Sequence, residues 1–363
     1  MKSSEPEHGL DEIPESGGTS DHQVAQLLRL PGRSGLAASP SSSSGGYVRE
    51  IDSRSLTMYT NQVGGHQVLV KPKDSSIILK PYDEAEYNFY DQCVPLICSA
   101  LMPFTARCFG EVDLRTTSSD YSSPSGSTPV IPGKSGKYVM LEDLAHGFSR
   151  PCILDLKMGL KQRSIRNYSE KKVLSNESKS KSTTSHILGF RVGGAQLYKA
   201  DGIVFHNKYF GRLQDVEGTY EILRSFFESV ANIAIRHKII KTLIAKLVEL
   251  REVIKSLSGF RFWSGSLLLI FDSAIGEDTD VDKSVILKMI DFANYTRLER
   301  NRDYDCEYVY GIVSLVLFLQ GVFEDAIPSS LLRRMAPALS PTLQDDELID
   351  AVEAYRKAHS PHV

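Results

Sequence analysis

A carboxylate and an amine stand two residues apart in the segment from Pro151 to Gly159, whose fixed pattern is Pro-x-x-x-Asp-x-Lys-x-Gly. On an extended strand, residues i and i+2 project to the same face, so we expect the side chains of Asp155 and Lys157 to lie together. A carboxylate can hold a hydroxyl group and an amine can bind a phosphate, which suits phosphoryl transfer. A surface ion pair at a strand end would explain the two residues equally well.

A second candidate carboxylate, Asp291, ends an apolar run that begins at Val285. Mg²⁺ takes few ligands from protein and fills its coordination sphere with phosphate oxygens and water. One aspartate is therefore chemically sufficient for a magnesium ion that works with ATP. The plainer alternative is that Asp291 caps the turn after the strand.

Three segments, in sequence order, resemble motifs of the inositol polyphosphate kinase family. Residues 151–159 match every fixed position of its P-x-x-x-D-x-K-x-G signature, residues 264–268 (Ser-Gly-Ser-Leu-Leu) resemble its Ser-Ser-Leu-Leu segment, and residues 290–293 (Ile-Asp-Phe-Ala) resemble its metal-binding motif. The resemblance covers residues 60 to 320. It implies an α+β, two-lobed kinase-like fold with a small N-lobe, a larger C-lobe and an inserted inositide-binding segment.

The resemblance also implies a binding site for ATP. Lys80 closes a β-type run and Glu86 follows early in a helix, and in kinase-like folds such a lysine binds the nucleotide phosphates and pairs with a helix carboxylate. Residues 86–90 (Glu-Tyr-Asn-Phe-Tyr) resemble the family's E-x-x-F-Y pattern. Lys71 is the alternative lysine.

Three further residues are implied on the nucleotide side. Glu142 and Leu144 would contact adenine through their backbone at the hinge between the lobes, and Ser266 would be the hydroxyl partner of the metal ligand Asp291. A helix N-cap at 142–144 and a polar strand face at Ser266 are the simpler readings.

Basic residues crowd the stretch from 157 to 181, although the whole chain has a net charge of −3. A polyphosphorylated ring needs several cations from different directions, and arginine adds bidentate contacts. A solvated surface is the usual explanation for such a run, but this one begins at the Asp155/Lys157 motif. The predicted acceptor ligands are Lys157, Lys161, Arg163, Lys171, Lys172 and, from the family's S-x-x-L-G-x-R-x-x-G pattern, Arg191.

Segments 154–159, 209–218 and 261–264 look most like the inositol hexakisphosphate kinase branch, which forms a pyrophosphate, with the multikinase and trisphosphate kinase branches as rivals. Three positions depart from the family pattern. Gly265 replaces the first serine of the Ser-Ser-Leu-Leu motif, Asn294 stands where the family has His or Lys, and Glu307 replaces a glycine. These departures bear on substrate choice and rate, and they motivate the hypothesis of a non-catalytic inositide-binding scaffold.

The composition favours a globular protein in a reducing compartment. The 363 residues are 41% hydrophobic and 24% charged, and the five cysteines lack disulfide or metal-ligand spacing. The apolar run from Val313 to Phe323 is short for a membrane span. We expect a monomer in the cytoplasm or nucleus, with no nucleic-acid partner and no membrane insertion.

Composition shifts predict the organisation of the chain. We expect a disordered segment over 1–46, an N-lobe and hinge over 47–144 with a disordered loop insert over 116–136, a C-lobe over 145–336 with its inositide-binding segment over 160–187, and a helix or tail over 337–363. Strands are expected at 67–70, 77–80, 104–112, 138–141, 188–197, 202–205, 262–272 and 285–291. Helices are expected at 83–100, 216–257 with a break near His237, 308–320 and 345–357.

The predicted function is transfer of phosphate from Mg²⁺-bound ATP to an inositol polyphosphate, with inositol hexakisphosphate as the first candidate. Asp155 would orient either the acceptor or the ATP ribose, and Lys157 would bridge the acceptor and the γ-phosphate. A protein or lipid kinase is the third hypothesis, weakened because no His-Arg-Asp catalytic loop is found in the sequence.

Overall fold

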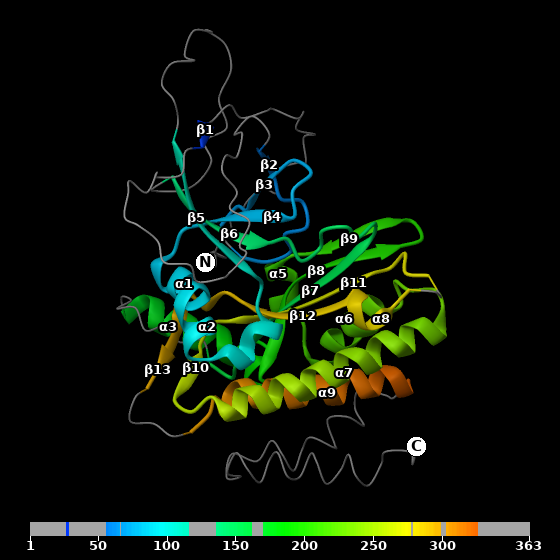
Figure 1. Cartoon of the computed structure of the whole chain (residues 1–363). Helices are drawn as coiled ribbons and strands as arrows, with labels where there is room; N and C mark the ends of the chain where they lie inside the picture. Colours follow the sequence, from blue (N-terminus) through cyan, green and yellow to red (C-terminus); the bar gives the residue numbers. More distant parts are fainter. Residues whose placement is uncertain are drawn as a thin grey trace, which may run out of the picture.

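A computed structural model describes residues 27–28, 56–65, 67–115, 136–161, 170–276, 279–298 and 303–325. Nearly all of the predicted segments 1–46 and 116–136, and all of 337–363, lie outside these residues. Within 1–46, only Leu27–Leu28 is described, and it forms a short strand, β1, that pairs with β5. The described chain folds into two large sheets, one above the other in Figure 1, with helices beneath the lower sheet, and a third sheet of two strands.

The N-terminal sheet has the order β1-β5-β6-β4-β3-β2, and every neighbouring pair is antiparallel. Its other strands are β2 (Leu56–Met58), β3 (Val70–Pro72), β4 (Ile77–Pro81), β5 (Cys108–Arg115) and β6 (Lys137–Glu142). The strand expected from Phe104 begins only at Cys108, because a 3₁₀ helix, η3 (Ser99–Phe104), occupies the preceding turn.

The helix expected over 83–100 is shorter and interrupted. Asp83 caps α1 (Glu84–Asn88) as predicted, since its carboxylate accepts a hydrogen bond from the backbone N–H of Glu86. The helix then widens into a π-helical turn, η2 (Phe89–Cys93), before the short α2 (Val94–Leu96). A π turn inserts a residue into the helical ladder and is common near functional sites.

The C-terminal sheet has five strands in the order β12-β11-β7-β8-β9, and all neighbours are again antiparallel. The strands are β7 (Pro151–Met158), β8 (Phe190–Lys199), β9 (Gly202–His206), β11 (Ser266–Asp272) and β12 (Val285–Ile290). The strand expected over 262–272 is divided, because a turn separates β11 from β10 (Phe260–Phe262), which pairs instead with β13 (Tyr295–Arg297).

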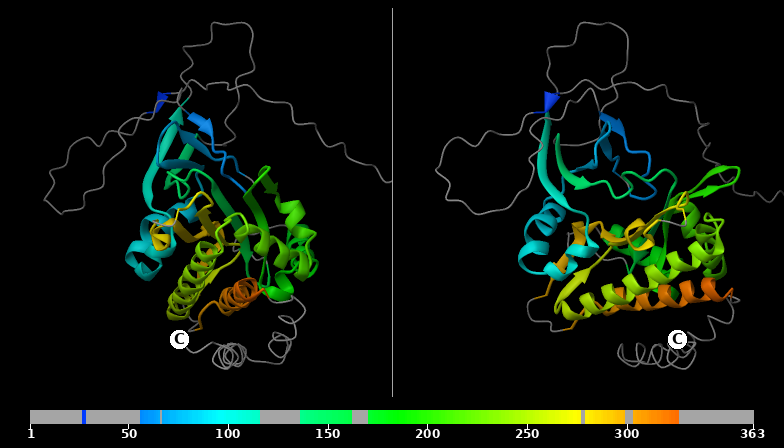
Figure 2. Two further views of the ribbon diagram at one scale, coloured as in Figure 1. Left: turned by 90° about the vertical axis from the view of Figure 1, so that its right-hand side faces the viewer. Right: turned by 45° about the vertical axis from the view of Figure 1, so that its right-hand side comes forward.

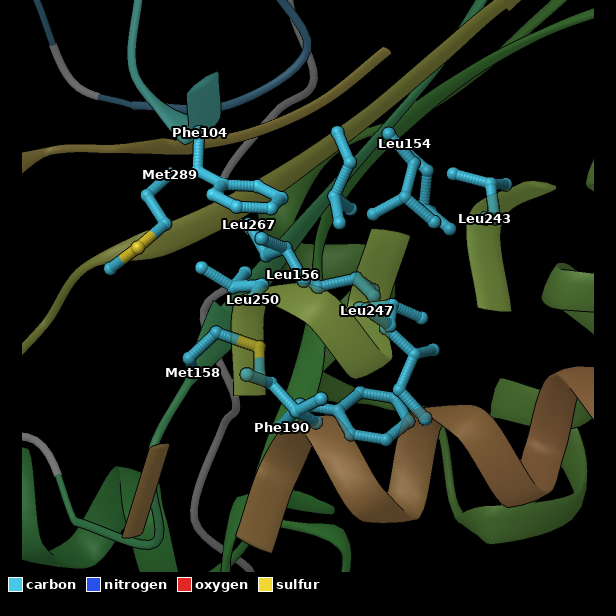
Figure 3. Packing of buried hydrophobic residues seen from close by; sticks show 14 of the residues in the cluster. Phe104, Leu154, Leu156, Met158, Phe190, Leu243, Leu247, Leu250, Leu267 and Met289 are labelled. Carbon is cyan, nitrogen blue, oxygen red and sulfur yellow. The ribbon is translucent and has the colours of Figure 1, made fainter. Parts of the chain in front are cut away.

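One face of β7 packs in the hydrophobic core and the other lines a cavity. Leu154 and Leu156 point to the helical side and are fully buried in the main core, whereas Ile153, Asp155 and Lys157 point to a cavity on the other side. Figure 3 shows Leu154, Leu156 and Leu267 of the sheet facing three leucines of one helix, Leu243, Leu247 and Leu250. Burial of leucine side chains stabilises the fold by roughly 1.5–3 kcal/mol each, so this layer holds the functional face in place.

Two long helices cover the lower face of this sheet side by side, α7 (Ile233–Ser256) and α9 (Cys306–Glu324) (Figures 1 and 2). The break expected near His237 lies earlier, between α6 (Val216–Phe227) and α7. The reason is Asn232, whose side chain accepts hydrogen bonds from the first backbone N–H groups of α7. The remaining helices are α3 (Glu170–Lys181), α4 (Ser185–Leu188), α5 (Lys208–Arg212), α8 (Val281–Ser284) and η5 (Phe292–Asn294).

Helix α9 extends beyond the predicted 308–320. The helix is long and apolar enough to cross a membrane, but 72% of its most apolar stretch of 18 residues is buried inside the protein. Asp305 starts the helix by accepting from the N–H of Tyr308, and it also accepts from the N–H of Phe262 on β10. A buried core helix accounts for its apolar character.

Candidate active site

A cavity of about 530 Å³ lies between the two sheets. Its upper wall comes from β4, β6 and residues 59, 61–65, 67 and 69, and its lower wall comes from the cavity-facing side of β7, β11 and β12. Part of the lining is apolar and includes Leu69, Ile78, Ala106, Leu141, Leu144, Leu268, Ile270 and Ile290. Of these, Leu144, Leu268 and Ile270 pack in one hydrophobic cluster. Charged side chains form another part of the lining.

Asp291 belongs to this charged part and lies between two amines. The Nζ of Lys80 is 2.9 Å from its Oδ1 and the Nζ of Lys157 is 2.5 Å from its Oδ2. Lys80 also bonds Glu86 at 2.8 Å, and the same Glu86 oxygen accepts from the backbone N–H of Phe292. One chain of ion pairs thus joins strand β4, helix α1, strand β7 and the turn after β12.

The turn that carries Asp291 has a backbone φ of 67°, a left-handed value uncommon for a residue with a side chain. Such conformations persist where the surroundings hold them, and they concentrate at functional sites. Burial opposes the charge of Asp291, but the two lysines outweigh it and hold the pKa of this carboxyl well below its ordinary value. Burial likewise disfavours the charged Lys80, yet Glu86 and Asp291 raise its pKa above the ordinary value.

Asp155 lies on the cavity side of β7 with Lys157, as the i, i+2 spacing predicts, but it is only 2% exposed. Gly64 lies so close to the carboxylate of Asp155 that a Cβ at residue 64 would collide with it. Gly193 of β8 contacts the same carboxylate, at the point where the β7–β8 register shifts. Its Oδ1 has no hydrogen-bond partner within the described residues. Burial therefore raises the pKa of Asp155, with Lys157 offsetting only part of the effect.

Strand β6 ends at Glu142, and both Glu142 and Leu144 line the cavity. Asp143, between them, points elsewhere and is buried. It accepts hydrogen bonds from the hydroxyl of Tyr59 (2.7 Å), the backbone N–H of Ala145 (3.0 Å) and the Nζ of Lys71. Lys71, the alternative lysine, thus braces the segment and does not line the cavity, whereas Lys80 does.

Ser266 pairs with Lys157 across β11 and β7, but its side chain is fully buried and does not line the cavity. Its hydroxyl has no partner among the described residues. The serine that lines the cavity is Ser264, whose backbone oxygen is 3.5 Å from the Nζ of Lys157. Of the family departures, Asn294 also lines the cavity and Gly265 does not.

Only some of the predicted acceptor ligands line the cavity. Lys157 and Arg191 line the cavity, whereas Lys161 and Lys171 are exposed and do not. The backbone N–H of Lys161 is held by the carboxylate of Glu307 at 3.1 Å, which fixes the start of the predicted inositide segment. Arg163 lies outside the described residues, as does the side chain of Lys172.

Three cations that were not among the predicted acceptor ligands also line the cavity: Lys179, which lies in the basic stretch 157–181, Lys208 and Arg212. Lys208 and Arg212 are four residues apart on α5, a spacing that puts them on one face of a helix. The sequence contained a signal for this helix, because asparagine is a typical N-cap residue and Asn207 does cap α5. Gly211 lets this helix lie directly on β8, since a Cβ there would collide with the backbone oxygen of Val192.

Arg191 is nearly buried, and its guanidinium donates to the hydroxyl of Ser185 at 3.0 Å. Within the described residues, neither Arg191 nor Arg212 forms an ion pair with a carboxylate. Burial and the nearby charge of Arg212 lower the pKa of Arg191 to about 10. Two adjacent guanidinium groups without an acidic partner favour a multiply charged anion.

Among the described residues, the structure contains no cluster of three or more His, Cys, Asp or Glu side chains that could enclose a metal ion. Asp291, which the sequence predicts as a metal ligand, lines the cavity. A metal ion that also binds phosphate oxygens and water needs few ligands from the protein.

The sequence and fold resemble those of known proteins. Residues 138–320 match the family described as Inositol polyphosphate kinase. Inositol hexakisphosphate kinase 2 of Oryctolagus cuniculus is 31% identical over 226 residues, which are 52% of this chain and 52% of that protein. Inositol hexakisphosphate kinase 3 of Mus musculus is 32% identical over 209 residues, 53% of this chain and 52% of that protein. The matched regions thus span about half the length of these relatives.

A crystal structure of inositol phosphate multikinase from S. cerevisiae, in complex with ADP and Mn²⁺, has the same fold. The TM-score is 0.54 with 22% identity, and the match covers 68% of this chain and 98% of that one. The likeness confirms the predicted α+β kinase-like fold. With the family match over half of the residues, it follows that the chain belongs to the inositol polyphosphate kinase family.

Proposed function

We propose that the protein transfers the γ-phosphate of ATP to an inositol polyphosphate. The observation that carries the proposal is one cavity whose lining combines apolar side chains with six cations, Lys80, Lys157, Lys179, Arg191, Lys208 and Arg212. The apolar side chains suit a flat base beside residues 142–144, and the cations suit two groups of phosphates. The named relatives that share the sequence are inositol hexakisphosphate kinases, so that hexakisphosphate is the first acceptor to test.

The nucleotide side of the mechanism rests on the ion-pair chain. With a nucleotide bound, Lys80 exchanges part of its contact with Asp291 for phosphate oxygens and stays oriented by Glu86. Asp291 fits a magnesium ion through the chemistry of its carboxylate, and the ion would neutralise charge on the β- and γ-phosphates. Lys157, whose Nζ is 2.5 Å from the Oδ2 of Asp291, would bridge the γ-phosphate and the acceptor.

The acceptor side needs little proton chemistry. A phosphate acceptor is already ionised, so catalysis consists of positioning and charge neutralisation. Arg191 and Arg212 hold the ring phosphates from the β8–α5 side, and Lys157 holds the reacting one. Asp155 orients the acceptor or a ribose hydroxyl once the segment containing Gly64 shifts away from its carboxylate.

Incubation of the purified protein with ATP, Mg²⁺ and a panel of inositol phosphates tests the proposal. We expect an ATP-dependent product from inositol hexakisphosphate, and about a hundredfold to thousandfold loss of turnover in Asp291→Asn, because the nucleotide metal loses its carboxylate. Arg224→Ala, at a partly exposed side chain of α6, is the control and should keep wild-type turnover. Absence of product from every inositol phosphate at high enzyme concentration refutes the proposal.

A non-catalytic inositide-binding protein is the second candidate, and the observation in its favour is the burial of Asp155 under Gly64. This candidate predicts that inositol hexakisphosphate and ADP both bind but no turnover follows. It also predicts that Asp291→Ala leaves binding of the inositide unchanged. Calorimetric titration of both ligands, alongside the turnover assay, separates the two candidates.

A further inference from the structure

Two cysteines outside the cavity lie close enough to react with each other. The Sγ atoms of Cys93 and Cys98 are 3.7 Å apart, and both residues are buried. The thiol of Cys98 also donates to the backbone oxygen of Cys93 at 3.3 Å. The other cysteines, Cys108, Cys152 and Cys306, are free thiols as well.

The backbone between the two cysteines holds their side chains together. The N–H groups of Ile97 and Cys98 both donate to the oxygen of Cys93, at 2.9 and 3.0 Å, so the chain folds back on itself after α2. The connecting turn lies at the surface, where Leu96 is 79% and Ile97 is 52% exposed. Both cysteines belong to the edge of the main hydrophobic cluster that this turn covers, so a local opening of the turn gives a reagent access to the thiols.

We propose that Cys93 and Cys98 are a redox-active pair that forms a reversible intramolecular disulfide by exchange with a low-molecular-weight disulfide such as oxidised glutathione. The sulfur of Cys93, as thiolate, attacks one glutathione sulfur, which forms a mixed disulfide and releases the first glutathione thiolate. The sulfur of Cys98 then attacks that of Cys93, losing its proton and releasing the second glutathione. Two protein thiols are oxidised, and one glutathione disulfide is reduced to two glutathiones.

The contacts of the pair indicate which sulfur reacts first. The thiol of Cys98 donates to the backbone oxygen of Cys93, a contact that holds Cys98 in its protonated form. The contact between the two sulfurs lowers the pKa of Cys93, although burial of Cys93 acts in the opposite direction. We therefore assign Cys93 as the attacking thiolate and Cys98 as the resolving thiol.

The pair is placed where a cross-link affects the cavity indirectly. Cys93 ends the π-helical turn η2, which continues directly from the helix that carries Glu86. Phe89 in that turn stacks on Phe292, next to Asp291, with ring centroids 3.9 Å apart. A disulfide would fix the end of this helix, so the inference concerns the helix and does not depend on the proposed catalysis.

Equilibration of the full-length protein with a glutathione redox buffer tests the inference. The measured quantity is the effective concentration of the two thiols for each other, in native protein and in the same chain unfolded in urea. Because the native fold holds the sulfurs together, we expect a native value at least about tenfold above the unfolded one. Peptide mapping by mass spectrometry should join Cys93 to Cys98, with the loss of two hydrogen atoms.

Matched variants complete the experiment. Cys98→Ser should abolish the internal cross-link, whereas Cys108→Ser should leave the effective concentration unchanged. If Cys98→Ser does not fold, mapping of the disulfide in the wild-type protein still shows whether Cys93 is joined to Cys98. A native effective concentration at or below the unfolded value, or a native cross-link through another cysteine, overturns the inference.

Discussion

At the residue scale, two lysines on neighbouring strands each reach a carboxylate, and the carboxylates set their roles. Lys71 on β3 meets the buried Asp143, which also binds Tyr59 and so has its full set of partners inside the protein. Lys80 on β4 meets Asp291, whose side chain is 27% exposed to the cavity. An incoming phosphate can therefore compete for Lys80 and not for Lys71.

This difference predicts the outcome of two matched substitutions. Lys80→Met should weaken ADP binding at least about tenfold, because a charge-assisted hydrogen bond contributes on the order of 1.5–3 kcal/mol. Lys71→Met should lower the unfolding midpoint but weaken ADP binding less. Calorimetric titration with ADP and thermal unfolding measure both effects, and an equal loss of affinity in the two variants would contradict the assignment.

Asp155 and Asp291 should respond to pH in opposite directions. The pKa of Asp155 is raised by burial, so its charged form is disfavoured in the folded state and stability falls as pH rises above the ordinary carboxyl range. The pKa of Asp291 is depressed, so its contribution is present above that range and is lost as pH falls. Asp155→Asn should therefore stabilise the protein more at pH 8 than at pH 4, and Asp291→Asn should destabilise it more at pH 8.

Thermal unfolding of the two variants and the wild type across this pH range measures the effect. A change of a few degrees in midpoint is resolvable for a protein of this size. The contacts of Gly64 with Asp155, and of Lys80 and Lys157 with Asp291, require that the two carboxylates differ in environment. If the unfolding midpoints of the two variants change with pH in the same way, this difference does not exist.

At the element scale, segment 61–65 crosses from the upper sheet to the lower one. Gly64 lies on Asp155, the backbone oxygen of Val63 approaches Gly194, and the side chain of Asn61 accepts from Gln196 on β8. The segment reaches β7 and β8, with Asp155 lying 91 residues after Gly64 and Gln196 lying 135 residues after Asn61. Residues 61–65 form no strand and line the cavity, so we expect this part of the wall to move when a ligand enters.

Gly64→Ala tests the close approach of this segment. A Cβ at residue 64 would collide with the carboxylate of Asp155, so we expect the segment to be displaced and the protection of its amides from hydrogen exchange to fall by at least about tenfold. The matched control is Gly276→Ala, where the added Cβ meets its nearest neighbour, Thr279, at 3.8 Å. Unchanged exchange in residues 61–65 of Gly64→Ala would contradict the contact.

Helix α5 gives a prediction about the acceptor. Arg212→Ala should raise the KM for inositol hexakisphosphate by about tenfold or more, because the loss of a charge-assisted contact weakens binding by roughly 1.5–3 kcal/mol. Affinity for ADP should stay at the wild-type value. Steady-state kinetics and ADP titration check the two statements, and an equal effect on both ligands would remove Arg212 from the acceptor site.

The sequence predicted strands and motifs better than it predicted the residues that meet across the cavity. Alternation and the i, i+2 rule placed Asp155 and Lys157 on one face of β7, because those signals are local. The contact of Gly64 with Asp155 depends on how two sheets stack, which no local pattern encodes. Lys161 and Lys171 were expected in the cavity because they follow the motif, but the structure leaves both exposed outside it. The short helix α5 supplies cations in their place.

At the scale of the whole molecule, the two sheets are joined on one side by a direct brace. Lys288 of β12 donates to the backbone oxygens of Pro103 in η3 (2.8 Å) and of Thr105 just after it (3.0 Å). Thr105 also forms an isolated β-bridge with Met289. The chain then continues into β5 of the upper sheet. This brace therefore ties β12 to the segment that leads into the upper sheet, and burial lowers the pKa of the Lys288 amine.

Lys288→Met should weaken this connection without touching the cavity. The change keeps the aliphatic stem but leaves two carbonyl oxygens without their donor, at a cost of roughly 1–3 kcal/mol in the free energy of unfolding. Lys283→Met, on the exposed α8, is the matched control and should change stability by less than about 0.5 kcal/mol. Denaturant unfolding measures the stability of both variants.

The number of unfolding transitions tests how the two halves are connected. If the halves are held together mainly by this brace, unfolding of Lys288→Met should separate into two transitions. A single transition, shifted to lower denaturant, would instead assign the main connection to the aromatic cluster around Phe89 and Phe292.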